Sequence, residues 1–264
     1  MPDRVDAMLD EAERQQFAGW DFSWLRGRIV SEPLPWDYTA VVVDHARRSP
    51  DLVDLGTGGG EWLAQLAYRP ARTVATEAWP PNVSVARARL EPLGIEVVQV
   101  PPARDNTGKP VDAAASPLPF ADAEFHLVVD RHESFDVGEV ARVLAPDGWF
   151  ITQQVDAGND ADYRRLFGIE DRVPGPDERW DAWMPAQLER AGLDLVEQQS
   201  APFVQTVRDV GALAYNLNAI PWIVPDFSIA THRARLREIQ ARIDRDGPIT
   251  VRQRRYFVRA QRRD

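Results

Sequence analysis

Residues 51–63 read Asp-Leu-Val-Asp-Leu-Gly-Thr-Gly-Gly-Gly-Glu-Trp-Leu, an apolar run that passes through glycines into a helical pattern. Glycine adopts backbone conformations that other residues avoid, so Gly56, Gly58 and Gly60 allow a sharp turn and a close approach of the backbone to a ligand. A helix that begins near Glu61 presents unpaired amide groups to that turn. The segment therefore predicts a strand, a nucleotide-binding turn and a helix.

A carboxylate supports this interpretation. Glu77 follows Gly56 by 21 residues and ends the next expected strand, where an acidic side chain accepts hydrogen bonds from ribose hydroxyls. The glycine spacing argues against a dinucleotide, because Glu61 stands where a G-x-G-x-x-G motif has its third glycine and would repel a pyrophosphate. The alternatives are an ordinary strand-to-helix turn and a solvent-facing strand end.

The rest of the chain alternates short β-rich runs with helical patterns, which is typical of an α/β fold with a parallel sheet. Roughly 50 residues between the last two expected strands exceed a compact connection and indicate a helical insertion. We expect an N-terminal helical extension or lid (1–48), an α/β core (49–204), a helical lid insertion (205–248) and a final strand that completes the core (249–264). The expected strands cover residues 52–55, 73–77, 95–100, 125–130, 149–155, 193–196 and 256–260.

Composition limits the function classes. The 264 residues contain no cysteine, which excludes a disulfide framework, a thiolate nucleophile and a cysteine-ligated metal, and we expect no metal site. The N-terminus lacks the pattern of a secretory signal, and no run approaches the ~20 apolar residues that span a bilayer, so we expect a cytoplasmic protein without a membrane partner. The net charge of −10 is uneven, since residues 231–264 hold eleven arginines against four acidic residues. An acidic surface disfavours nucleic acid, although a local arginine cluster could still bind it.

Three further segments extend the pattern: Leu118-Pro-Phe-Ala-Asp-Ala-Glu-Phe-His-Leu-Val128, Ala141-Arg-Val-Leu-Ala-Pro-Asp-Gly-Trp149 and Leu188-Glu-Arg-Ala-Gly192. Together with the glycine segment, and in the same order, they resemble the motifs of the class I S-adenosylmethionine (SAM)-dependent methyltransferases of type 11. The resemblance covers about residues 50–200 and the final strand. It implies a Rossmann-like, doubly wound, seven-stranded, mostly parallel sheet with helical lid additions, SAM as the cofactor and a methyl-transferring enzyme.

The resemblance also implies cofactor-binding residues. Asp54 and the turn with Gly56, Thr57, Gly58 and Gly60 would hold the methionine part, Glu77 and Ala78 would hold the ribose, and Asp130 would lie beside the cofactor. The segment after the third strand, with Asp112 and Ala113, would hold the adenine. There the chain departs from the family pattern, since Ala114 takes the place of the usual acid and Asp112 lies two residues earlier.

The fourth expected strand ends in Val128-Val-Asp-Arg-His-Glu133. The carboxyl ends of parallel strands carry ligands in open α/β sheets, so Asp130, His132 and Glu133 are the candidate catalytic residues. We expect His132 to act as a base or to orient the acceptor, with Asp130 or Glu133 holding its ring. The alternative is that His132 caps the following helix. The segment lacks the D/N-P-P-Y/F signature of enzymes that methylate amino groups of DNA bases.

Aromatic residues outside the core predict a lid over the strand ends. Such an enclosure suits a small, partly apolar or aromatic molecule that is methylated on oxygen or nitrogen. The alternatives are an RNA methyltransferase that uses the C-terminal arginines, which could equally form a solvated helix face, and a SAM-binding module without catalysis. The candidate acceptor-binding residues are Trp20, Trp24, Trp36, Tyr163, Tyr215 and Trp222.

Overall fold

The computed structural model describes residues 3–103, 117–156, 158–170, 175 and 179–263. Among them, eight strands form one sheet in the order β1-β7-β8-β6-β5-β2-β3-β4. β4, β3, β2, β5 and β6 run parallel, whereas β8, β7 and β1 join antiparallel. The strands are β1 Ile29–Ser31, β2 Asp51–Leu55, β3 Arg72–Glu77, β4 Glu96–Gln99, β5 Phe125–Arg131, β6 Leu144–Val155, β7 Leu193–Val207 and β8 Ile249–Arg262.

Helices pack on both faces of the sheet, so the predicted doubly wound α/β fold is confirmed. α5 and α7 cover one face with a core around Phe150, and α2, α3 and α4 cover the other with a core around Ile151. The described helices are α1 Arg4–Arg14, α2 Tyr38–Ala46, α3 Glu61–Ala64, α4 Pro80–Leu90, α5 Val137–Val143, α6 Ala161–Leu166, α7 Trp180–Arg190, α8 Val210–Ala219 and α9 Ile229–Asp246, with short 3-10 helices η1 Ser23–Leu25 and η2 Glu91–Leu93.

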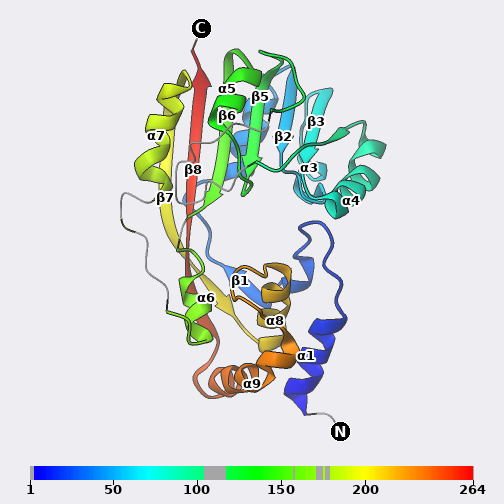
Figure 1. The fold of residues 1–264 in the computed structure, drawn as a ribbon, viewed down its shortest axis with the longest axis vertical. Coiled ribbons are helices and arrows are strands. Elements are labelled where there is room, and N and C mark those ends of the chain that lie inside the picture. The colour runs from blue at the N-terminus through cyan, green and yellow to red at the C-terminus, as the bar shows by residue number, and fades with distance from the viewer. Residues whose placement is uncertain (1–2, 104–116, 157, 171–174, 176–178, 264) are drawn as a thin grey trace.

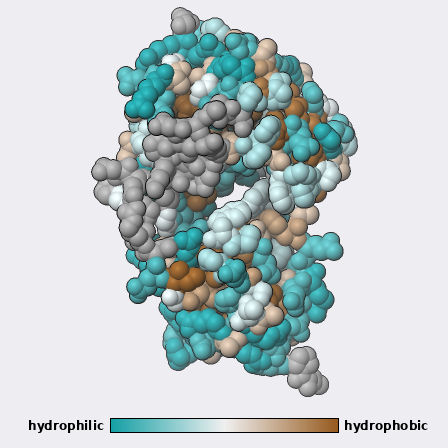
Figure 2. Space-filling model, in the orientation of Figure 1, coloured by the Kyte–Doolittle hydropathy of each residue, from teal (hydrophilic) through white to brown (hydrophobic). Residues whose placement is uncertain are grey.

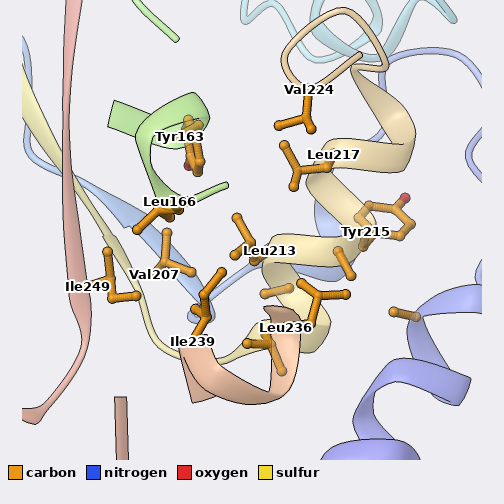
Figure 3. Packing of buried hydrophobic residues seen from close by; sticks show 14 of the residues in the cluster. Tyr163, Leu166, Val207, Leu213, Tyr215, Leu217, Val224, Leu236, Ile239 and Ile249 are labelled. Carbon is orange, nitrogen blue, oxygen red and sulfur yellow. The ribbon is translucent and has the colours of Figure 1, made fainter. Parts of the chain in front are cut away.

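The molecule has two lobes (Figure 1). We call the sheet with α2–α5 and α7 the sheet lobe, and α1, α6, α8 and α9 with β1 the helical lobe. β7 and β8 run through both, paired from Leu193 with Arg262 to Val207 with Ile249. The helical lobe has its own core, in which α6, α8 and α9 point Tyr163, Leu213 and Ile239 toward one another (Figure 3).

Three strand predictions differ from the structure. The sheet has eight strands rather than seven, because the three-residue β1 pairs with the far end of β7 and shows no alternating pattern that would reveal it. β7 and β8 have 15 and 14 residues, whereas the sequence predicted only 193–196 and 256–260. A polar run in β7, Glu197–Ser200, and another in β8, Arg252–Arg255, interrupt the hydrophobic period while the backbone ladder continues.

The excess of arginines near the C-terminus is partly balanced by acidic residues near the N-terminus. Arg233 pairs with Asp6 and Asp10, and Arg237 pairs with Asp3 and Asp6, all on or beside α1. Each exposed ion pair contributes little to stability, but the network neutralises the basic face of α9 and fastens it to the N-terminal helix. In the described part of the chain, no helix has the length and apolar character needed to cross a bilayer.

Candidate functional site

The glycine segment forms the predicted strand, turn and helix. Gly56, Gly58 and Gly60 have φ values of +64°, +64° and +78°, a left-handed region that strains other residues. The turn is fastened to β3, because the Thr57 amide donates to the Thr76 carbonyl at 2.8 Å. The helix that follows, α3, has only four residues.

Two side chains from distant segments lie against this turn. A Cβ added to Gly58 would collide with the ring of Trp20, and one added to Gly56 would collide with Glu133. Trp20 also contacts Trp222, with ring centroids 6.1 Å apart. The N-terminal segment and the loop after α8 therefore meet at the glycine turn, where both tryptophans are exposed.

Glu61, whose charge is expected from the sequence to repel a pyrophosphate, forms an ion pair with Arg89. Arg89 also donates to the carbonyl of Gly59 within the turn. The negative charge of Glu61 is thus largely compensated.

Glu77 lies at the end of β3, and its side chain is almost fully buried. Its Oε1 accepts a hydrogen bond from the Trp79 amide at 2.8 Å. Burial raises the pKa of this carboxyl, and backbone N–H groups of Trp79, Gly58 and Ala78 partly offset that effect. Glu77 therefore lies at the base of the turn, with its charge supported by the backbone.

Next to Glu77 is a pocket with apolar walls and polar rims, a composition suited to a nucleoside. Asp112 and Ala113, which the family resemblance assigns to the adenine, lie outside the residues that the structure describes. The lining residues are Leu55, Gly56, Thr76, Ala78, Val100, Pro101, Ala103, Leu118, Glu133, Ser134, Phe135, Asp136, Glu139 and Val140.

Arg142 holds one wall of this pocket in place. Its guanidinium donates to the carbonyls of Leu118 at 3.0 Å and Phe120 at 2.8 Å, and it pairs with Asp122 and Glu139. Arg142 therefore connects residues 118–128 with residues 141–149 through hydrogen bonds. The positions of these two segments in the sequence do not predict that contact.

Asp130 is fully buried at the end of β5. Its Oδ1 accepts hydrogen bonds from Thr152 Oγ1 at 3.1 Å and from the Gln154 amide, and Oδ2 has no partner among the described residues. Burial, and then the nearby Glu133, raise the pKa of this carboxyl well above its usual value. Burial thus favours the protonated form of Asp130 over the charged one.

His132 follows β5 in a left-handed conformation, with φ +70°. Its Nε2 lies 3.0 Å from the amide nitrogen of Gln153, whose Oε1 accepts a hydrogen bond from Trp36 Nε1 at 2.8 Å. An indole N–H can only donate, so the amide oxygen must face Trp36 and the amide nitrogen must face His132. His132 Nε2 is then the acceptor, and the proton of the neutral ring is on Nδ1.

The surroundings of His132 favour this neutral form. His132 is exposed at the surface, yet desolvation by the protein atoms around it, and then the charges of Arg255 and Arg131, lower its pKa well below 6.5. The expectation that Asp130 or Glu133 holds the ring was wrong, because Gln153 does so from the neighbouring strand. The capping alternative was also wrong, because the cap of α5 is Asp136, whose side chain accepts from the Glu139 amide.

The six aromatic candidates fall into three groups. Trp20 and Trp222 are exposed beside the glycine turn. Tyr163 and Tyr215 are buried in the helical lobe, where Trp24 packs on Tyr215 with centroids 4.8 Å apart. Trp36 is buried and stacks on Phe257, so it reaches the site only through Gln153.

Five further residues near the site were not predicted from the sequence. The structure brings together Tyr38, Trp62, Arg131, Gln153 and Arg255 in the same region.

The raised pKa of Asp130 predicts a pH-dependent effect on stability. Because the folded pKa lies above the unfolded one, wild-type stability falls as pH rises above about 3.8, where only the unfolded chain ionises. We expect Asp130→Asn, which keeps the Oδ1 acceptor, to match wild type near pH 4 and to be more stable at pH 8. Urea unfolding of both proteins from pH 4 to 8 measures the difference; a less stable variant at pH 8 would show that the carboxylate is ionised.

Comparisons with known proteins agree with this geometry. Residues 53–152 match the family model of a methyltransferase domain. A crystal structure from Bacillus halodurans C-125, named as a methyltransferase candidate, has 20% identity and a TM-score of 0.54, and the alignment covers 86% of this chain and 99% of that one. The YcgJ protein from Bacillus subtilis has 17% identity and a TM-score of 0.52, with 86% and 98% covered.

At these identities the two structures establish the fold alone. No curated protein sequence matches the chain. The family model, however, covers the glycine turn, β3, β5 and α5, which are the elements that form the pocket and the end of β5 described above. Residues 53–152 therefore match a methyltransferase domain, and the chain shares the fold of the two crystal structures.

Proposed function

We propose that this protein binds SAM at the glycine turn and transfers its methyl group to a small acceptor held between the two lobes. The proposal rests on one observation, which is that three structural features lie next to one another. They are a turn whose glycines leave no room for a Cβ, the carboxylate of Glu77 beneath it, and the pocket beside it.

These residues fit the cofactor in chemical terms. Glu77 would accept hydrogen bonds from the ribose hydroxyls, and the turn from Gly56 to Gly60 would approach the methionine part. The pocket whose lining includes Ala78 and Leu118 would enclose the adenine. When bound, SAM supplies an electrophilic methyl group on a sulfonium.

The chain's own contribution to catalysis is mainly alignment and exclusion of water. Neutral His132, with Nε2 occupied by Gln153, presents a hydrogen-bond donor at Nδ1 rather than a free base. It is thus suited to orient an acceptor atom. Trp20 and Trp222 provide apolar surface beside the turn and favour a small, partly apolar or aromatic acceptor, methylated on oxygen or nitrogen.

The RNA alternative has less support. On α9 and β8, Arg233, Arg237 and Arg252 are all engaged with carboxylates of this same chain. A phosphate backbone would have to displace those partners. The salt dependence of acceptor binding separates the two functions, because only RNA binding should weaken steeply as salt is raised.

Ligand binding tests the proposed cofactor. We expect SAM and S-adenosylhomocysteine to bind with measurable heat in calorimetry, and NAD to give none, because the glycine spacing departs from the G-x-G-x-x-G motif of dinucleotide-binding turns. Comparable affinity for NAD, or no heat with either adenosyl ligand, would overturn the proposal. Formation of S-adenosylhomocysteine across a panel of acceptors then separates an enzyme from a SAM-binding module.

A further inference from the structure

Among the residues that the structure describes, two guanidinium groups near His132 have no ion-pair partner. Arg131, the last residue of β5, is exposed and stacks on Trp62, with Cζ 5.2 Å from the ring centroid. Arg255 of β8 lies over Phe203, with Cζ 5.0 Å from that centroid. Within the described ranges, no carboxylate oxygen lies within 4.0 Å of either group. This distinguishes them from the paired arginines of α9.

The remaining contacts of Arg255 are with neutral atoms. Its Nη1 donates to Asn159 Oδ1 and to the carbonyl of Arg254, each at 3.0 Å. The other guanidinium nitrogens have no hydrogen bond to the described part of the protein, and the side chain is only half-buried. The group is thus fixed in position by Asn159 and Phe203, with donors left for a further ligand.

Both arginines act on the same imidazole, since the charges of Arg255 and Arg131 both lower the pKa of His132. Desolvation is the largest cause that lowers the pKa of Arg255, to about 10, and it also lowers that of Arg131. Both side chains reach solvent, while the protein atoms around them desolvate their guanidinium groups. Figure 2 shows the surface hollowed between the two lobes.

The strand register agrees with this placement. Gln153, which holds His132, is opposite Phe257 on β8, and Arg255 lies two residues further along the same strand. Residues two apart on a strand share a face of the sheet. The stretch of β6 and β8 between the lobes therefore brings Arg255 to the side of the sheet on which Gln153 contacts His132.

The acidic residues nearby do not balance these charges. Asp54 and Glu61 face Arg131, but Glu61 is paired with Arg89, and burial raises the pKa of Asp54 to about 7. Asp160 faces Arg255 from beyond ion-pair distance. Partly desolvated cations without counter-ions are costly unless a ligand supplies the opposite charge.

We propose that the methyl acceptor carries an oxyanion, a carboxylate or a phosphate, which pairs with Arg255 and accepts the Nδ1 proton of His132 in a hydrogen bond, while Arg131 adds positive potential. This inference rests on the proposed function and specifies its substrate class. An arginine fork matches the planar or tetrahedral oxygens of such a group, and charge-assisted hydrogen bonds are the strong ones.

Calorimetry with small probes tests the inference. Benzoate and phenyl phosphate, with benzamide as the neutral counterpart, are titrated into the free protein and into protein saturated with S-adenosylhomocysteine. We expect at least one anion to bind about tenfold more tightly than benzamide, and Arg255→Gln to abolish that preference. The matched control is Arg254→Gln, since Arg254 points to Asp156 and Ser200 instead, and it should keep the preference.

The outcomes distinguish this inference from the proposed function. Equal binding of benzoate, phenyl phosphate and benzamide would overturn the anion site, even if the adenosyl ligand binds. Absence of S-adenosylhomocysteine binding would overturn the proposed function, while the free protein still tests the anion site. If Arg255→Gln does not fold, Arg255→Lys should keep a preference for anions.

A further comparison identifies the source of the anion. The carboxylate on the methionine part of the cofactor could pair with Arg255 in place of the acceptor's anion. 5′-Methylthioadenosine lacks that carboxylate and therefore serves as the comparison ligand. If Arg255→Gln weakens S-adenosylhomocysteine but not 5′-methylthioadenosine, the arginine serves the cofactor and the proposed acceptor class is wrong. We expect Arg255→Gln to leave the ratio of the two affinities unchanged.

Discussion

Replacement of His132 by alanine is expected to lower kcat about 100-fold, the scale on which loss of alignment or of proton transfer acts. Cofactor affinity should stay nearly unchanged, because the imidazole contacts Gln153 and not the glycine turn. Turnover measured with saturating SAM, together with calorimetry of S-adenosylhomocysteine, separates the two effects. Wild-type turnover in the variant would show that His132 has no part in the reaction.

His132→Asn distinguishes an orienting role from a basic one. The asparagine amide can donate a hydrogen bond near the position of Nδ1, and asparagine tolerates the left-handed backbone found here. An orienting residue should therefore be rescued to within about tenfold of wild type, whereas a base should not be. Thermal unfolding of both variants checks that the loss in His132→Ala does not come from strain at φ +70°.

The pH dependence follows from the same geometry. Because the folded pKa of His132 lies below 6.5, the ring remains neutral as the pH falls from 7.5 through 6.5, and kcat should stay level across that window. Gln153→Glu would place a carboxylate against Nε2 and favour the protonated ring. Nitrogen NMR of the imidazole should then show a charged His132 at a pH where the wild-type ring is neutral.

Glu77→Ala is expected to weaken the binding of S-adenosylhomocysteine by at least tenfold. The change removes the acceptor that we propose for two charge-assisted ribose hydrogen bonds, each worth about 1.5–3 kcal/mol before solvent compensation. It also removes the carboxylate that supports the backbone N–H groups of Gly58, Ala78 and Trp79. Calorimetry measures the dissociation constant directly.

Glu77→Gln is the matched control. It keeps the size of the side chain and one acceptor oxygen, so it should preserve the turn and lose only part of the affinity. An unchanged dissociation constant in Glu77→Ala would mean that another group holds the ribose. Circular dichroism of both variants confirms that the fold is retained.

The elements that the sequence predicted are those with strong local signals. β2 is buried along its length and runs directly into glycines, so its position and the turn were predictable from residues 51–63 alone. The link from Trp36 through Gln153 to His132 was not predictable, because it joins three segments whose contact depends on the register of β5 with β6. The orientation of Asp130 toward Thr152 and away from His132 depends on the same pairing.

Polar strands account for the remaining errors. Within their long pairing, β7 reads Glu197-Gln-Gln-Ser200, and β8 carries Arg254 and Arg255. Such residues give no hydrophobic period, so only the apolar ends of these strands were predictable. Arg255 was therefore assigned to a basic tail, although the backbone ladder brings it next to the candidate site.

The continuous ladder of β7 and β8 also bears on how such a protein can diversify. Residues 208–248 leave the sheet at Val207 and return at its direct partner Ile249, so this segment is the tip of one hairpin. Insertions between paired ends disturb little else, because the closure cost grows only slowly with length. Lengthening or rebuilding that tip would reshape the wall of the proposed acceptor site, while the glycine turn, which belongs to a separate segment, kept its position. Acceptor preference and cofactor binding can thus evolve on separate segments of one continuous sheet.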